Sequence, residues 1–188
     1  MIRLRLLTFA VALLAFVPPA AADDAELFKA LRSPGHFGLM RHSTAPGFDD
    51  PPNFQLRDCA TQRNLSAEGR TRAAAIGEGL RANGLGQARV ASCQWCRCLD
   101  TARLLGLGAV EESPAFNTLL SYAGPAAGTT AAARDWIQRQ ELRTPLIVVT
   151  HNVNINGLVS THTEEGDIVV VERATGGALR VLGTIRAQ

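Results

Sequence analysis

The chain has 188 residues, 46% of them hydrophobic and 5% aromatic, and a formal net charge of +2 at pH 7. This length suits one domain with a substantial core. Two arginines among the first five residues account for the whole excess charge, and the neutral, aromatic-poor remainder gives no indication of a nucleic-acid or anionic-lipid partner.

Residues 1–22 show the three-part pattern of a secretion signal. After the charged start comes an apolar run over residues 6–17, which is too short to span a membrane, and then an Ala-x-Ala cleavage site at Ala20–Ala22. An uncleaved anchor helix is the alternative interpretation. We expect cleavage to leave a single domain over residues 23–188, periplasmic or secreted, with no stable membrane span.

Strands and helices alternate along the rest of the chain. The first expected elements are, in chain order, a helix over 24–32, a strand over 36–41, a loop over 43–64 and a helix that follows the N-cap Ser66 and ends at Asn83. The next are a strand over 88–92, a helix over 94–105, an irregular stretch over 111–128 and a helix from Thr129 or Thr130 to Leu142.

Three strands are expected in the last part of the chain. Residues 146–150 form a continuous apolar run, typical of a strand that is buried on both faces. Residues 168–172 and 179–185 flank Gly176-Gly177, as expected of a hairpin. The elements together predict an α/β fold, with three α/β/α layers, a largely parallel central sheet and an antiparallel C-terminal hairpin.

Basic side chains follow three of the expected strands. The first strand ends at Arg41 and His42. The second leads to Arg97 on the opening turns of a helix, and the third ends at His151. Because the ligand crevice of an open α/β sheet lies at the carboxyl ends of its strands, we expect these four side chains to meet at one edge.

Two guanidinium groups and two imidazoles would form a cationic pocket that suits a phosphoryl group. Arginine matches phosphate oxygens with two parallel hydrogen bonds. A neutral imidazole can attack phosphorus, and the guanidinium groups can neutralise charge in the transition state. We therefore expect no metal ion and no other cofactor, and the sequence has no acidic cluster with metal-ligand spacing.

The sequence contains four cysteines: Cys59, Cys93, Cys96 and Cys98. An exported chain meets oxidising conditions, so disulfides are expected, and of the possible pairings we prefer one that joins Cys59 to Cys96. A zinc site on Cys93-x-x-Cys96-x-Cys98, or a thiol-redox function, is the alternative. Zinc is disfavoured because structural zinc sites usually combine two separated ligand clusters.

Four motifs resemble those of the histidine phosphatase superfamily, whose fold is also called phosphoglycerate-mutase-like. Leu39-Met-Arg-His-Ser43 is similar to its Arg-His-Gly motif, with serine in place of glycine, and Leu65-Ser-Ala-Glu-Gly-Arg70 is similar to its Leu-Ser/Thr-x-x-Gly-Arg helix start. Residues 92–102 resemble its Ser-x-x-x-x-Arg-x-x-x-Thr-Ala block, and Val149-Thr-His151 resembles its late strand with the second histidine. The resemblance runs from about Gly35 to the C-terminal hairpin.

The resemblance implies an exported phosphatase that hydrolyses phosphomonoesters, with a small phosphorylated substrate and no metal. His42 would be the nucleophile that becomes a phosphohistidine, which water then hydrolyses. Arg41, Arg97 and His151 would hold the transferring phosphoryl group. A non-catalytic phosphate-binding member of the same fold is the alternative.

The sequence departs from the superfamily at the proton donor that the leaving group needs. Mutase-like members carry a glutamate in the insertion after the second strand, where this chain has Phe116-Asn117-Thr118. Acid-phosphatase-like members carry an aspartate directly after the second histidine, where this chain has Asn152. Four other carboxylic acids are candidates for the role: Asp49, Asp50, Glu111 and Glu112.

Overall fold

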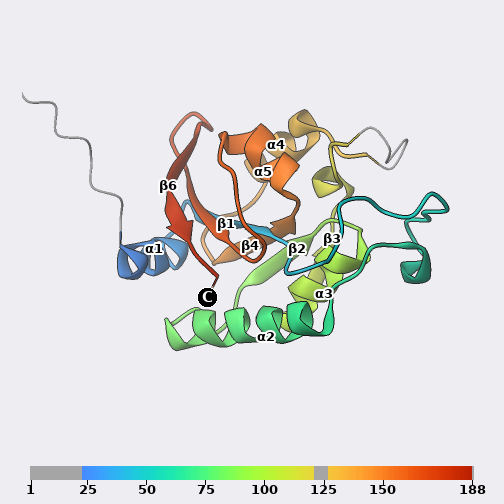
Figure 1. Cartoon of the computed structure of the whole chain (residues 1–188). Helices are drawn as coiled ribbons and strands as arrows, with labels where there is room; N and C mark the ends of the chain where they lie inside the picture. Colours follow the sequence, from blue (N-terminus) through green and yellow to red (C-terminus); the bar gives the residue numbers. More distant parts are fainter. Residues whose placement is uncertain (1–22, 121–126, 188) are drawn as a thin grey trace, which may run out of the picture.

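The computed structural model describes residues 23–120 and 127–187. The signal peptide predicted at 1–22 lies outside these ranges. Within them, no helix combines the length and the apolar character that crossing a bilayer requires. The described chain is built around one six-stranded sheet (Figure 1).

The strands of this sheet are β1 (His36–Arg41), β2 (Arg89–Ser92), β3 (Val110–Glu112), β4 (Leu146–Thr150), β5 (Ile168–Arg173) and β6 (Leu179–Ile185). Their order is β3-β2-β4-β1-β5-β6. The first four in this order run parallel, whereas β5 is antiparallel to β1 and β6 is antiparallel to β5. Every residue of β4 is buried, as its apolar run predicts. The predicted hairpin is present, and Gly176 and Gly177 in its turn both have a φ of 86°, which favours glycine.

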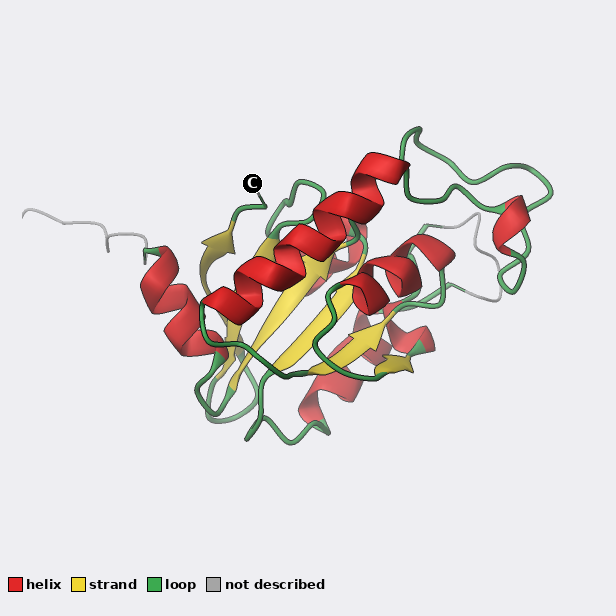
Figure 2. Cartoon of the chain, turned by 90° about the horizontal axis from the view of Figure 1, so that it is seen from below, coloured by secondary structure: helices red, strands yellow, loops and turns green. Residues whose placement is uncertain are grey.

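Helices cover both faces of the sheet: α1 (Asp24–Leu31), α2 (Ala67–Ala82), α3 (Cys96–Leu104), α4 (Thr130–Gln138) and α5 (Asn152–Val159). Helices α2 and α3 lie on one face, and α4 and α5 lie on the other (Figure 1). Figure 2 views the first of these faces and shows α2 lying in front of the strands. Helix α1 packs against β6 and β1. The predicted three-layer α/β/α architecture is therefore confirmed.

The chain that follows β1 is held against the first turn of α2. The Ser66 hydroxyl caps this helix by accepting a hydrogen bond from the Gly69 N–H, at 2.9 Å. A Cβ atom at Gly69 would lie 2.1 Å from the Thr44 carbonyl oxygen, so only glycine allows this close approach. The Ser43 hydroxyl in turn donates to the Gly69 carbonyl at 2.8 Å. Helix α2 therefore fixes the backbone directly after His42.

The structure corrects three details of the predicted elements: one missed strand and two helix ends. The stretch expected to be irregular contains β3, a strand of three residues whose two glutamates are exposed, so that it shows no apolar alternation. The helix expected to reach Leu142 ends at Gln138. Helix α3 begins at Cys96 rather than Gln94, because Trp95 has an extended backbone at the N-cap position.

Candidate active site

The carboxyl ends of β1, β2 and β4 lie level with one another. Arg41 pairs with Thr150 across β1 and β4, and Ser92 pairs with Val149 across β2 and β4. The residues that follow these strands therefore come to one edge of the sheet, as the sequence predicts.

His42 is a buried, neutral imidazole with a defined tautomer. Its Nδ1 atom lies 2.8 Å from the Ser43 carbonyl oxygen. A carbonyl oxygen only accepts hydrogen bonds, so Nδ1 carries the proton and Nε2 carries the lone pair. Burial and the positive charges of Arg97, Arg63 and Arg41 lower the pKa of His42 to about 3, although its hydrogen bond to Ser43 opposes this. The ring therefore stays neutral, and nucleophilic at Nε2, at physiological pH.

His151 meets His42 at the end of β4. The two ring centroids are 5.5 Å apart. Its Nε2 atom lies 3.2 Å from the Cys93 sulfur and 3.7 Å from the Cys98 sulfur, and these two cysteines form a disulfide. Burial, followed by the charge of Arg97, lowers the pKa of His151 well below its ordinary value.

Arg97 lies on the first turn of α3, with a side chain that is only 1% exposed. Its two terminal nitrogens reach the two carboxylate oxygens of Asp50, at 2.8 and 3.3 Å. The same carboxylate accepts hydrogen bonds from the Trp95 indole at 2.8 Å and from the Arg63 backbone at 2.9 Å. The guanidinium fork of Arg97 is thus set to bind a planar pair of oxygens, and Asp50 supplies them in this structure.

These contacts exclude Asp50 as the proton donor in the arrangement observed. Burial alone would raise the pKa of Asp50, but the hydrogen bonds from Arg97 and its charge outweigh that effect, and the pKa is lowered. A carboxyl group with a lowered pKa holds no proton at neutral pH. The carboxylate is instead the bound partner of Arg97.

The other acidic candidates lie elsewhere. Asp49 is exposed in the loop after β1. Glu111 and Glu112 are on β3 at the sheet edge, with β2 and β4 between them and β1. Glu112 pairs with Arg57 at 2.8 Å. None of these contacts directs a carboxylic acid toward His42.

Arg41 lies at the rim of the site. Its guanidinium donates to the Thr163 carbonyl oxygen at 2.9 Å and lies 3.6 Å from the Glu165 carboxylate. It is therefore tied to the loop before β5, although its charge still lowers the pKa values of both His42 and His151. Asn152, at the aspartate position of acid-phosphatase-like proteins, accepts hydrogen bonds from the Thr163 N–H and hydroxyl and so fixes the same loop.

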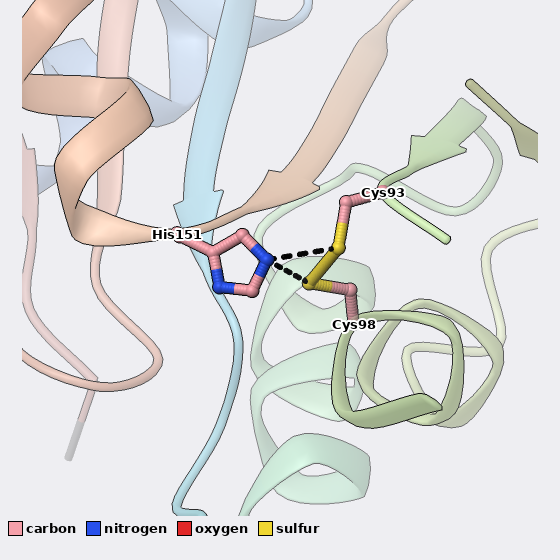
Figure 3. Close-up of side chains that lie close together, drawn as sticks. All are labelled: Cys93, Cys98 and His151. Carbon is pink, nitrogen blue, oxygen red and sulfur yellow. Dashed lines mark hydrogen bonds between the residues drawn. A yellow bond between two sulfur atoms is a disulfide. The ribbon is translucent and has the colours of Figure 1, made fainter. Parts of the chain in front are cut away.

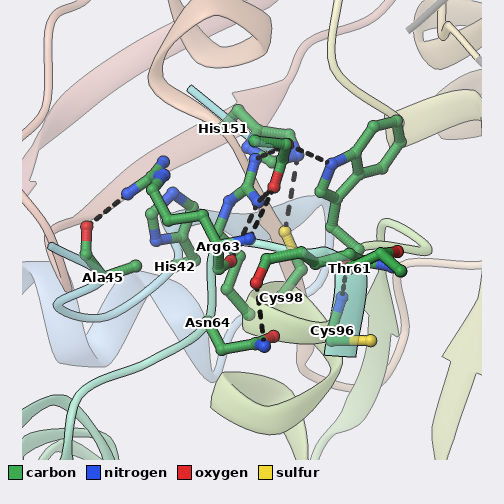
Figure 4. A network of polar contacts seen from close by, with 12 residues as sticks. His42, Ala45, Thr61, Arg63, Asn64, Cys96, Cys98 and His151 are labelled. Carbon is green, nitrogen blue, oxygen red and sulfur yellow. Dashed lines mark hydrogen bonds and ion pairs between the residues drawn. The ribbon is translucent and has the colours of Figure 1, made fainter. Parts of the chain in front are cut away.

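Arg63 is a third arginine of the site, and it was not predicted from the sequence. Figure 4 shows it beside His42 and His151. Its guanidinium donates to the Ala45 carbonyl oxygen, and its charge lowers the pKa of both imidazoles. Its place two residues before the Leu65–Arg70 motif is the only indication that the sequence offers.

The predicted Cys59–Cys96 disulfide is confirmed. It ties the 3-10 helix Cys59–Thr61 in the loop after β1 to the start of α3. Both Asp50 and Arg63 belong to that loop, so the disulfide holds their segment against the helix that carries Arg97. The remaining cysteines, Cys93 and Cys98, pair with each other.

No family model and no curated protein matches this chain, but solved structures do. The protein histidine phosphatase SixA, complexed with tungstate, has a TM-score of 0.62 at 16% identity over 81% of this chain and 97% of that chain. The mycobacterial glucosyl-3-phosphoglycerate phosphatase, in complex with VO3, has a TM-score of 0.59 at 15% identity over 81% of this chain and 99% of that chain. The product of an open reading frame from Mycobacterium tuberculosis has a TM-score of 0.57 at 17% identity, over 79% of this chain and 96% of that chain. These similarities show the fold, which is the phosphoglycerate-mutase-like fold of histidine phosphatases.

Proposed function

We propose that this chain is a phosphatase that hydrolyses phosphomonoesters through a phosphohistidine on His42. The observation that carries the proposal is the state of that imidazole. It is buried and neutral, its Nδ1 proton is held by the Ser43 carbonyl, and its Nε2 lone pair is free to act as a nucleophile.

The surrounding charges suit both halves of such a reaction. Nε2 of His42 attacks phosphorus while the ester oxygen leaves and takes a proton from water, and a second water molecule then attacks the phosphohistidine and releases inorganic phosphate. Arg97, Arg63 and Arg41 supply positive charge that stabilises the phosphoryl oxygens in each transition state. His151 lies close enough to His42 to contact the same phosphoryl group.

The Asp50–Arg97 pair indicates how substrate would bind. A phosphate presents the same pair of oxygens to the guanidinium fork that the carboxylate presents now. Substrate would therefore displace Asp50 from Arg97. The structural neighbours with tungstate and VO3 support the binding of an oxyanion in this fold, and tungstate carries four oxygens around its central atom as phosphate does.

We also propose that the protein is exported by residues 1–22 and acts in the periplasm or outside the cell. The pattern of this segment supports the proposal. The two disulfides support it as well, because disulfides persist mainly in oxidising compartments.

A panel of phosphate esters, assayed with the mature protein and with His42→Ala, tests the proposed activity. Wild type should turn over at least one ester, and His42→Ala should lose roughly 10³-fold or more of that rate. His162→Ala, at an exposed position in the loop before β5, should retain it. Normal turnover by His42→Ala would refute the nucleophile. If wild type binds phosphate but releases none from any ester, the alternative of a non-catalytic phosphate-binding protein is favoured.

A further inference from the structure

The Cys93–Cys98 disulfide lies against His151, and the proposed hydrolysis uses that imidazole but gives the disulfide no role. Cys93 follows β2, Cys98 lies on the first turns of α3, and His151 follows β4, the neighbour of β2 in the sheet. Their three ligand atoms all lie within 4.8 Å of one another, and all three side chains are buried. Figure 3 shows Nε2 of the imidazole directed at both sulfur atoms.

The distances in this group match those of a tetrahedral metal site. Zinc binds sulfur at about 2.3 Å and imidazole nitrogen at about 2.0 Å, which places neighbouring sulfur and nitrogen ligands about 3.6 Å apart. The two sulfur-to-nitrogen distances are 3.2 and 3.7 Å. The nitrogen ligand is therefore already in place, and the sulfurs need only separate from each other.

Reduction of the disulfide would supply that separation and the ligands. A dithiol reductant gives two electrons and two protons to Cys93 and Cys98, the S–S bond breaks, and the dithiol is itself oxidised to a disulfide. A divalent cation then displaces the two thiol protons. Two thiolates cancel the charge of the ion, so the complex adds no net charge to the basic site around Arg97.

We propose that Cys93, Cys98 and His151 are a latent Cys2His site for a zinc-like divalent cation, opened by reduction of the Cys93–Cys98 disulfide. Three protein ligands leave a fourth position for water, as in zinc sites with this ligand set. A consequence, which rests on the proposed function, is that the bound ion withdraws His151 from the phosphoryl group and slows turnover. The oxidised protein holds no such ion and is insensitive to chelators.

Metal binding is tested without reference to activity. The protein is reduced with dithiothreitol, freed of reductant under anaerobic conditions and titrated with Co²⁺ or Zn²⁺. We expect about one ion per chain, with thiolate-to-cobalt charge-transfer absorption, in the reduced protein and none in the oxidised protein. Cys93→Ser, Cys98→Ser and His151→Gln should each weaken binding, with circular dichroism reporting the fold of each variant.

The matched control is Cys59→Ser/Cys96→Ser, which removes the other disulfide and leaves the proposed ligands intact. It should bind the ion as reduced wild type does. The proposal is overturned if reduced wild type binds no metal, or if Cys93→Ser and Cys98→Ser bind it as well as wild type. It is also overturned if only the Cys59→Ser/Cys96→Ser variant loses the ion.

Activity provides the second measurement. Zinc should lower ester turnover by the reduced protein roughly 10²-fold, and a chelator should restore it. Full turnover with one ion bound at these ligands would refute the inhibitory role. If the oxidised wild type has no turnover to begin with, the proposed function fails while the metal titration still decides the site.

Discussion

The imidazole rings of His42 and His151 meet edge to face, with their centroids 5.5 Å apart and their planes at 73°. The two residues are more than 100 positions apart in the chain and follow the neighbouring parallel strands β1 and β4. Burial and nearby arginines keep both rings neutral, because both pKa values are lowered. One ring can therefore act as a nucleophile while the other contacts the group that it attacks.

Arg97→Lys should lower kcat/KM roughly 10²-fold, measured on any ester that wild type hydrolyses. Lysine keeps the charge but cannot make the two parallel hydrogen bonds that the guanidinium makes with a pair of oxygens. Arg103→Lys is the control, since Arg103 is on the same helix with a side chain that is 58% exposed. Equal kcat/KM values for Arg97→Lys and wild type would show that the fork does not hold the substrate.

Asp50→Asn should bind inorganic phosphate more tightly than wild type, by roughly 10-fold, as measured by calorimetry. The uncharged amide competes less well for Arg97 than the carboxylate does. Without phosphate the variant should be less stable, because the buried guanidinium loses its counter-charge. Asp49→Asn, the exposed neighbour, should change neither property. Weaker phosphate binding by Asp50→Asn would mean that Asp50 positions Arg97 rather than competing for it.

The stability of the protein should fall as the pH is lowered from 6.5 to 5. In the unfolded chain, His42 takes up a proton below its ordinary pKa of 6.5, whereas in the folded protein it stays neutral down to about pH 3. The unfolded state therefore binds more protons across this window. Each such imidazole lowers the free energy of unfolding by up to ~1.4 kcal/mol for each pH unit that the pH falls. His151 acts in the same direction.

Urea unfolding of wild type and His42→Gln across this pH range measures the effect. The slope of unfolding free energy against pH should be shallower in the variant. Data above pH 7, where the imidazole is neutral in both states, separate this linkage from any change in packing. Identical slopes would contradict the assignment of a buried, neutral His42.

The two disulfides should stabilise the protein unequally. Cys59 and Cys96 are 37 residues apart in sequence, and Cys93 and Cys98 are 5 apart, so the first closes the longer loop. The chain-entropy relation gives about 4 kcal/mol for the first and about 2 kcal/mol for the second. Comparing Cys59→Ala/Cys96→Ala with Cys93→Ala/Cys98→Ala by urea unfolding checks the order. A larger loss in the second pair would mean that local packing outweighs loop entropy.

The sequence predicts those parts of the site that regular elements position. His42, Arg97 and His151 each follow a strand or open a helix, and the ends of parallel strands meet by topology. Local patterns are sufficient to locate such elements. The short edge strand β3 was missed because its exposed glutamates carry no apolar alternation.

The loop after β1 could not be predicted in the same way. Its path depends on tertiary contacts, such as the Cys59–Cys96 disulfide and the Trp95 hydrogen bond to Asp50. Arg63 was therefore missed. Asp50 was singled out as an acid, but a carboxyl group's protonation depends on its partners, and the partner here is Arg97. Such roles are decided by contacts between segments that are distant in the sequence.

The most direct test is to trap the phosphoenzyme. The protein is mixed with a phosphate ester, quenched in alkali, in which phosphohistidine survives, and digested for mass spectrometry. We expect phosphate on the peptide that contains His42, attached at Nε2 because the proton on Nδ1 is donated to the Ser43 carbonyl oxygen. Phosphate on a different residue, or steady turnover with no phosphoenzyme at any time point, would contradict it.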